Sequence, residues 1–480
     1  MFDKRKQKLN EQGFILMVVL IMISLFLFIS MGAISFGVLQ QKLNLAKIAE
    51  EQALYVAEAG VNYYRWVLYN DPEEPCDLDS GGCVKEVGPV EFTDETGEKK
   101  GYYKLYITPP DLDASTIVTI RAEGWMEAYP DIKRVIEVKC GQPSLSSYTF
   151  LTNSSAWFGE NETLVGKVHT NEGIRMDGDN DSLVLSSNDY YICSSGHGCS
   201  YYNCSYPCTW TYYGCNCPGV WGDGPNDDLW DYPVPNVNFD IDLDDLKEDG
   251  QSEDGFFRED SGSYGYHIVF REGGVFDLSR VTKLNSYLIQ YDASEEDWDC
   301  CVYKQESIKK EEFINTYSIP DNGVIFFEDN VWVQGIIEGR ATLVAATPSG
   351  EPASILINNK IEYASRDNNN SFGLIGQNHI KVLRDAPNDM VIDGVLFAKE
   401  GRIFRNYYPN APEIKNDIEV YGSIISNKSW TWTWVDGSGD VIDGYRNTLS
   451  VYDPNASLLP PPHFPTTGNY KFISWKEIRE

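Results

Sequence analysis

The feature of this sequence that most limits its fold is a run of 26 residues, Phe14 to Leu39, without a charged residue, Asn or Gln. As a helix this run would extend roughly 39 Å, which exceeds the roughly 30 Å hydrocarbon core of a bilayer. A secretory signal instead has an apolar region of about 7–15 residues and a small-residue cleavage site. We therefore predict a membrane-spanning helix. Four basic residues precede it, which predicts a cytoplasmic N-terminus and an extracytoplasmic remainder.

The helix is expected to continue beyond the membrane. No Pro occurs before Pro72, and from Ala46 to Val67 small or apolar residues recur in steps of three and four, on one helical face. Charged residues lie on the opposite face. The pattern predicts one continuous helix over residues 14–70. Its stripe of Ala and Gly suits close packing, either against neighbouring helices or against the chain's own outer domain.

The rest of the composition favours a large extracytoplasmic protein rich in strands. The 480 residues are enough for two or three domains. The 30 Tyr, 12 Trp and 40 Gly are typical of strands joined by many turns. A net charge of −33 argues against nucleic acid as a partner, because phosphate binding needs clustered Lys and Arg. We predict an α+β, mainly β fold.

The N-terminal segments resemble a known family. A basic leader ends in Gly13 and is followed by Phe14, the apolar run and the stretch AEEQALYVAEAGVNYYRWVL, residues 49–68. This order resembles the class III signal of type IV prepilins and the first helix of PilX-like minor pilins. The resemblance implies that prepilin peptidase removes residues 1–13 and that Phe14 becomes the methylated N-terminus. It also implies other pilin subunits and the pilus assembly machinery as partners.

One position departs from that family. In major pilins the fifth mature residue is a Glu that pairs with the N-terminal amine of a neighbouring subunit, and here that position holds Val18. The resemblance therefore points to a minor, tip or assembly protein rather than to the repeating subunit. It leaves open whether the protein enters a fibre.

Residues 71–147 are expected to form a small antiparallel, pilin-like sheet. Three strand-like runs lie in this region, at 101–110, 115–126 and 132–140. The second and third partly alternate apolar and polar residues, as half-buried strands do. The segment that follows, from Trp157, also resembles part of secreted PilX-like proteins.

Residues 148–435 are expected to form a large β domain with a Cys-rich insertion at 193–217. A recurring pattern of Gly, short aliphatic strand and polar turn begins at Gly335, Gly373, Gly394 and Gly422. The spacings of 38, 21 and 28 residues favour a β-solenoid of stacked coils, with a β-sandwich as the alternative. Residues 436–480 are expected to be a C-terminal extension.

The eleven cysteines indicate disulfides and an oxidising compartment. Zinc is the alternative, but the spacings within the insertion contain no paired C-x2-C knuckle. The pairing cannot be derived, because six cysteines allow about 15 connectivities. Cys140 is expected to be a buried free thiol. The disulfide candidates are Cys76, Cys83, Cys193, Cys199, Cys204, Cys208, Cys215, Cys217, Cys300 and Cys301.

A short acidic motif is a candidate calcium site. Asp177, Asp179 and Asp181 alternate like the start of a calcium loop. However, Ser182 and Asn188 stand where an EF-hand needs Gly and Glu, so a turn rich in Asp and Asn is the alternative.

An aromatic motif is a candidate recognition surface. Trp430, Trp432 and Trp434 alternate in a strand-like segment and would share one face. Exposed, they would form an aromatic platform for a glycan or another subunit. Buried, they would cap the solenoid.

No enzymatic motif is present. The sequence contains no GxSxG, HExxH or Walker pattern, and its five His are far apart. We expect no catalytic activity and no cofactor other than calcium. The sequence as a whole predicts a minor pilin or a pilus assembly or tip protein at the cell surface, with a large outer domain used for adhesion. The alternatives are a membrane-anchored adhesin or carbohydrate-binding protein outside any fibre and, third, a solenoid that degrades glycans with acids assembled by folding.

Overall fold

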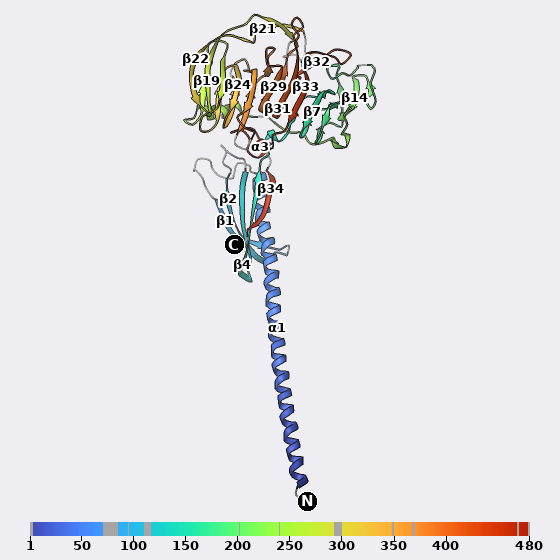
Figure 1. Ribbon diagram of the computed structural model, residues 1–480, viewed down its shortest axis with the longest axis vertical. Coiled ribbons are helices and arrows are strands. Elements are labelled where there is room, and N and C mark those ends of the chain that lie inside the picture. Colours follow the sequence, from blue (N-terminus) through green and yellow to red (C-terminus); the bar gives the residue numbers. More distant parts are fainter. Residues whose placement is uncertain are drawn as a thin grey trace. The chain divides into compact units, whose positions relative to one another are not determined.

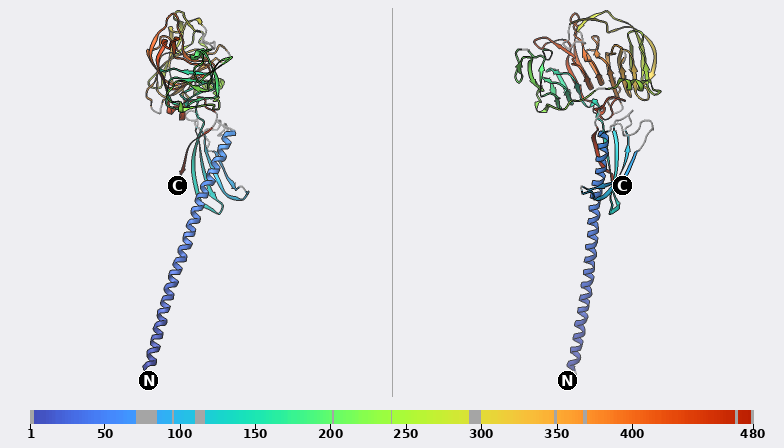
Figure 2. Two further views of the ribbon diagram at one scale, coloured as in Figure 1. Left: turned by 90° about the vertical axis from the view of Figure 1, so that its right-hand side faces the viewer. Right: turned by 180° about the vertical axis from the view of Figure 1, so that it is seen from behind.

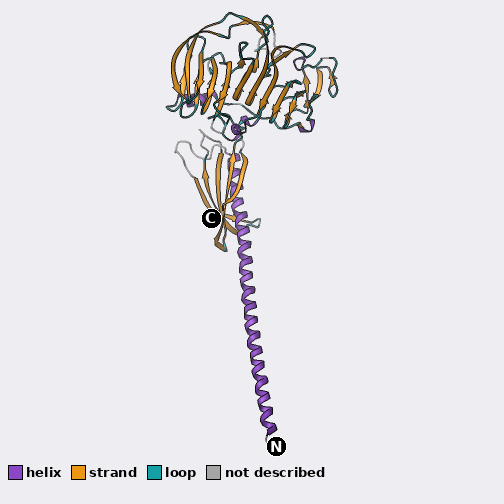
Figure 3. Cartoon of the chain, viewed as in Figure 1, coloured by secondary structure: helices purple, strands orange, loops and turns teal. Residues whose placement is uncertain are grey.

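The computed structural model describes residues 3–70, 85–94, 96–109, 117–200, 202–239, 241–291, 300–347, 350–366, 370–467 and 470–478. Figures 1 and 3 show a long N-terminal helix and many strands. The chain divides into two compact units. The first holds Met1–Pro109, Val118–Cys140 and Phe472–Glu480, and the second holds Pro110–Ile117 and Gly141–Lys471.

The first unit is built on helix α1, which runs without interruption from Asp3 to Asn70. At 1.5 Å per residue it is roughly 100 Å long. Between residues 14 and 45 every side chain except that of Ser30 is exposed, although most are apolar, and Phe28 is 85% exposed. Water is a poor environment for such a surface. By length and composition, α1 is able to cross a membrane.

The second half of α1 packs on a sheet of strand order β1-β2-β3-β4-β34. Figure 2 shows this sheet beside the helix. The pairs β1–β2 and β2–β3 are antiparallel. The buried side chains of β2 and β3 alternate along each strand, so one face of the sheet is apolar. The strands span Lys85–Thr93, Lys99–Thr108, Ile117–Met126, Tyr129–Gly141 and Lys471–Ile478.

The three strand runs expected from the sequence correspond to β2, β3 and β4. The outer strands β1 and β34 were not expected. β34 comes from the end of the chain, and ion pairs between Arg134 and Glu477 and between Lys476 and Glu137 link it to β4. The region predicted at 71–147 is therefore completed by residues from the segment predicted as a C-terminal extension.

Small residues bring α1 and the sheet together. A Cβ on Gly124 of β3 would lie 2.4 Å from the backbone oxygen of Ala53 and 2.4 Å from the backbone nitrogen of Ala57. Both alanines are fully buried. The stripe of Ala and Gly thus packs on the chain's own sheet, which settles the choice that its spacing left open.

The second unit is dominated by parallel strand pairing. Its longest ladder has the order β17-β23-β25-β27-β29-β31-β5-β8-β11-β16, and every neighbouring pair is parallel. Several of these strands lie side by side in Figure 1. They span Phe256–Arg258, Val324–Phe327, Arg340–Ala345, Ser371–Gly376, Asp389–Ala398, Ile414–Ser426, Phe150–Thr152, Val168–Thr170, Val184–Ser186 and Trp230–Asp231.

Further parallel rows accompany this ladder. The strands β18, β24, β26, β28 and β30 pair in that order, and β31, β33, β7 and β10 form another row. At one end β18, β19 and β22 pair antiparallel. The strands not yet bounded span Tyr266–Arg271, Val331–Ile337, Ile355–Tyr363, Ile380–Val382, Ile403–Arg405, Val441–Val451, Glu162–Val165, Asp179–Asn180, Val275–Leu284 and Ile308–Ser318.

Central strands of the longest ladder, such as β23 and β27, are buried on both faces. Inward side chains such as Ile325 and Leu374 lie in the main core, while their neighbours Phe326 and Ile375 lie in a second core on the other face. Phe239, helix α2 (Leu243–Gln251), and helix α3 (Pro454–Leu458) cover that second face. Strands buried on both faces read as continuous apolar runs, which is why segments such as VIFF and FGLIG do not alternate.

Two of the four recurring glycines occupy equivalent places in successive strands, whereas Gly373 lies opposite Val395 and Gly335 opposite Ile361. Gly394 of β29 pairs directly with Gly422 of β31, and both have positive φ, 144° and 148°. A Cβ on Gly422 would lie 2.0 Å from the backbone oxygen of Gly394. The stacking of these two strands therefore requires Gly at this level.

The predicted boundary at residue 435 is wrong. β33 (Val441–Val451) pairs with β31 on one side and with β7 on the other, so it is an interior strand of the second unit. The boundary failed because the strands that flank β33 are far from each other in sequence. Residues 436–480 are thus shared by both units rather than forming a separate extension.

The Gly124 contact predicts a specific weakness in the first unit. Gly124→Ala should force α1 and β3 apart at a cost of about 1–3 kcal/mol, typical of overpacking. Amide hydrogen exchange of residues 49–68, measured on the full chain in detergent, should accelerate about 10- to 100-fold. Gly37→Ala is the matched control, because a Cβ there meets nothing within 4 Å. Equal exchange in the two variants would contradict the prediction.

Candidate functional site

The Cys-rich insertion forms a small sheet of its own. β14 (Gly214–Pro218) pairs antiparallel with β12 (Tyr190–Cys193) and with β13 (Thr209–Thr211). The turn between β13 and β14 consists of Tyr212 and Tyr213. Since the insertion has little apolar core, its shape depends on covalent links. The disulfides join Cys193 to Cys199, Cys204 to Cys215, and Cys208 to Cys217.

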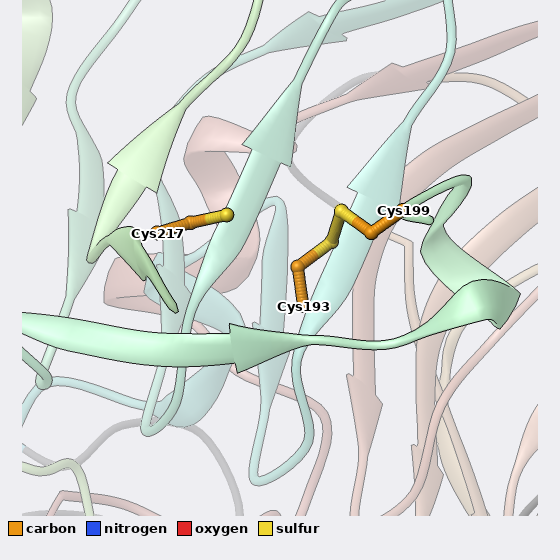
Figure 4. Close-up of side chains that lie close together, drawn as sticks. All are labelled: Cys193, Cys199 and Cys217. Atoms are coloured by element: carbon orange, nitrogen blue, oxygen red, sulfur yellow. A yellow bond between two sulfur atoms is a disulfide. The ribbon is translucent and has the colours of Figure 1, made fainter. Parts of the chain in front are cut away.

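For the cysteines of this insertion, zinc binding is the alternative to disulfide bonding. In the part of the chain that the structure describes, Cys193, Cys199 and Cys217 are the group of metal-ligand residues whose ligand atoms lie within 4.8 Å of one another. Figure 4 shows Cys193 bonded to Cys199, with Cys217 nearby. Cys217 is itself bonded to Cys208. A disulfide sulfur is not the thiolate that binds zinc, so the oxidised protein offers no such ligand set here.

Aromatic side chains project from the insertion. The fraction of the side chain exposed is 96% for Tyr206, 78% for Tyr212 and 76% for Tyr213, and Tyr202 and Trp210 are also exposed. Tyr212 and Tyr213 contact each other edge to face, with ring centroids 5.4 Å apart. The hydroxyl of Thr211 donates to the carbonyl of Gly214 at 2.8 Å and closes the turn that carries them. The disulfides thus hold a surface of exposed rings in place.

Arg175 of β9 (Ile174–Met176) anchors the base of this insertion. Its guanidinium lies over the rings of Trp157 and Trp221, 4.9 and 5.2 Å from their centroids. It donates to the carbonyl of His197 at 3.0 Å and pairs with Asp177 at 2.8 Å. The insertion is therefore tied to the core sheet of β9 and its neighbours by a stacked, charge-assisted contact.

The three aspartates of the calcium prediction bind separate partners. Asp177 accepts from the indole of Trp157 at 2.8 Å in addition to its ion pair with Arg175. The carboxylate of Asp179 accepts from Asn226 at 3.2 Å, and that of Asp181 accepts from the backbone of Gly166 at 2.7 Å. These bonds fit a turn in which each carboxylate satisfies a different segment. Calcium binding at these residues stays a prediction.

The tryptophans of the aromatic motif do not form an exposed platform. Trp430 and Trp432 are buried, at 8% and 1% exposure, and belong to the main core. The ring of Trp430 lies 5.1 Å from that of Phe150 and 5.5 Å from that of Phe158. Trp434 is half-buried and donates to the carbonyl of Arg405 at 2.9 Å. The predicted surface recognition is corrected to core packing for Trp430 and Trp432, because their rings are buried against strands distant in sequence. For Trp434 recognition stays a prediction.

The remaining cysteines are placed as follows. Cys140 is a buried free thiol, and burial raises its pKa. Cys301 of β21 (Cys300–Lys304) is disulfide-bonded. Cys76 and Cys83 lie outside the described residues. The processing residues Gly13 and Phe14 lie within α1.

A buried ion pair lies elsewhere in the second unit. Arg405 and Asp443 are both fully buried and pair at 2.6 Å. Asp443 also accepts from the backbone nitrogens of Tyr408, Glu413 and Gly444 at 2.8 to 3.0 Å. A carboxylate so fully bonded is held in place and has a structural role. It joins β30, the loop that follows and β33.

Comparison with known proteins adds little. No family model matches this sequence, and no curated protein matches it. Among solved structures, the competence-associated pilin ComZ from Thermus thermophilus is similar at 13% identity, covers 90% of this chain and 97% of its own, and has a TM-score of 0.25. A TM-score of this size does not establish a shared fold. The function therefore has to be inferred from the residues of this chain.

The structure predicts the products of a disulfide map. Digestion of the full chain under non-reducing conditions should yield the pairs Cys193–Cys199, Cys204–Cys215 and Cys208–Cys217, identified by mass spectrometry. Serine at both Cys204 and Cys215 should release the turn that carries Tyr212 and speed its amide exchange. Recovery of Cys193 linked to Cys204 would contradict the described arrangement.

His197 predicts a pH dependence for the attachment of the insertion. Burial, reinforced by the positive charge of Arg175, lowers the pKa of His197 from its usual 6.5 to about 4. The unfolded chain therefore takes up this proton more readily than the folded chain. The free energy of local unfolding should decrease as pH falls from 6.5 to 4. Exchange of residues 190–200, corrected for intrinsic pH dependence, should accelerate over this interval. His197→Gln should remove the acceleration, and an unchanged slope in that variant would refute the assignment.

Proposed function

We propose that this chain is a type IV pilin-like protein of the PilX-like minor pilin, tip or assembly kind, which displays its second unit at the cell surface for adhesion. In this proposal prepilin peptidase cleaves after Gly13, Phe14 becomes the methylated N-terminus, and the helix inserts into the cytoplasmic membrane. The partners are other pilin subunits and the assembly machinery. We assign the chain no catalytic role.

One observation carries the proposal, namely the division of α1 into two chemically different halves. Residues 14–39 expose mostly apolar side chains around the whole helix, which suits a bilayer or the interior of a helical fibre. Residues 49–68 bury one face against an antiparallel sheet through contacts such as Gly124 with Ala53 and Ala57. A single helix that serves both environments without a break is the arrangement that the sequence resemblance implies.

The architecture of the second unit suits a domain that is displayed at the cell surface. We propose that its stacked parallel ladders wind into a solenoid, in which each coil buries its aliphatic side chains against the next. The direct pairing of Gly394 with Gly422 supports this, because equivalent positions of successive coils coincide. Such a domain is a stiff support for the disulfide-bonded insertion. The insertion would supply the adhesive contact.

A membrane-anchored adhesin outside any fibre is the second candidate. Val18 favours it, since the carboxylate that pairs with a neighbouring subunit in major pilins is missing. The two candidates share the membrane helix and the displayed domain. They differ in processing and in whether the protein leaves the membrane with sheared pili.

Processing at Gly13 is the direct test. Protein isolated from cells should give an N-terminal sequence that starts at Phe14. Gly13→Leu should block cleavage and retain the leader, because the peptidase must accommodate the residue before the cut. Gly32→Leu is the matched control and should be processed normally, since a Cβ at Gly32 meets nothing within 4 Å.

The outcome separates the candidates. An intact Met1 in the wild-type protein would overturn the prepilin assignment. Cleaved protein found in sheared pilus fractions supports the minor pilin. Cleaved protein that stays entirely with the membrane supports the anchored adhesin.

A further inference from the structure

The Cys-rich insertion differs from the rest of the chain in its content of charged residues. Between Asp189 and Asp223 the sequence contains no Asp, Glu, Lys or Arg. Charged residues make up 23% of the whole chain, and its net charge is −33. The next 39 residues, 222–260, hold fourteen acidic and two basic residues. An uncharged segment is therefore followed in the sequence by a strongly acidic one.

The exposed groups of the insertion are of two kinds. One is the set of rings contributed by Tyr and Trp. The other is small and polar: Ser194, Ser195, Ser200, Asn203, Ser205 and Thr209 are exposed. The segment from Cys193 to Cys217 contains no Leu, Ile, Val or Met. A surface of Tyr, Trp, Ser, Gly and Asn offers rigid rings and adaptable hydrogen bonds, the combination found in binding loops.

This chemistry restricts the partner. Nucleic acids and acidic polysaccharides need basic residues, and the net negative charge of the chain repels them. A cationic partner would instead be drawn to the acidic segment 222–260. Protein interfaces are enriched in Arg and Met as well as in aromatic residues, and the segment from Cys193 to Cys217 contains neither Arg nor Met. A neutral sugar polymer, with flat C–H faces and many hydroxyls, complements both rings and small polar groups.

We propose that the insertion binds a neutral polysaccharide, with Trp210, Tyr212 and Tyr213 as the stacking residues. This inference rests on the proposed function only for the display of the second unit outside the cell. Trp210 lies on β13 opposite Cys215, and the two tyrosines form the adjacent turn. Their rings stack on sugar faces, and neighbouring Ser, Thr and Asn side chains bond to hydroxyls.

The disulfides lower the entropy cost of this binding. Cys215 is bonded to Cys204, and Cys217 is bonded to Cys208, so β14 is linked twice to the loop that directly precedes β13. Tyr and Trp have few rotatable bonds and lose little entropy when bound. A surface held in place before binding avoids the cost of ordering a loop at that moment.

Retention on insoluble glycans tests the proposal. The full chain in detergent is passed over cellulose, chitin and starch granules, with calcium pectate gel and albumin-coated beads in parallel. Retention on at least one neutral polymer is expected, with none on pectate or albumin. The triple variant Trp210→Ala, Tyr212→Ala, Tyr213→Ala should reduce that retention at least tenfold, while Tyr212→Phe and Tyr213→Phe should largely preserve it.

A matched variant tests whether the loss of any exposed tyrosine reduces retention. Tyr287→Ala removes another tyrosine of the second unit, 63% exposed, and should leave retention unchanged. An unchanged number of titratable thiols after denaturation shows that the triple variant keeps its disulfides.

Several results would overturn the proposal. These are no retention on any neutral polymer, equal retention on pectate or albumin, or a triple variant that binds as well as the wild type. Because binding is measured on solubilised chain, a failure of cleavage at Gly13 does not affect this result. Conversely, absent retention leaves the pilin assignment standing.

Discussion

The parallel pairing of β31 with β5 is the contact on which the second unit depends. Ile424 lies opposite Phe150 and Ile425 opposite Leu151, although these residues come from opposite ends of the unit's sequence. The chain enters at β5, builds the ladder outward to β16, and then returns from β17 to β31 to meet its own start. Without this contact each half would present an open edge of unpaired backbone groups. The aromatic contacts of Phe150 with Phe158 and Trp430 fill the same junction.

This topology explains what the sequence could and could not predict. Helix α1 was predictable because steps of three and four and the lack of Pro are local signals. The strands β2 to β4 were predictable because the partial alternation of apolar and polar residues is also a local signal. β34 was missed since its neighbour β4 lies far along the chain, and β33 was missed since one of its two flanking strands, β7, comes from the start of the second unit. Nothing local distinguishes such a strand from an extension. The tryptophans were ambiguous because burial is decided by Phe150, which lies far from them in sequence.

The candidate site also combines features that the sequence could predict with features that it could not. Its cysteines and aromatic residues are visible in the sequence, but the pairing of the cysteines is not. The anchor at Arg175 was also missed, since it combines Trp157, Trp221 and the carbonyl of His197 from separate segments. One signal was available: Asp177 lies two residues after Arg175 in a strand-and-turn segment, a spacing that suits a local ion pair.

The way α1 uses its faces also bears on the role of the protein. The small residues between Ala49 and Gly60 are occupied by the chain's own sheet, so contact with other helices is left to the exposed half, residues 14–45. That half offers apolar packing but no carboxylate at Val18 to fix the axial position of a neighbour. Apolar contacts tolerate many alignments, whereas an ion pair selects one. We infer that such a helix suits a position where few neighbours must be matched, as at a fibre end or in the membrane, rather than repetition along a fibre.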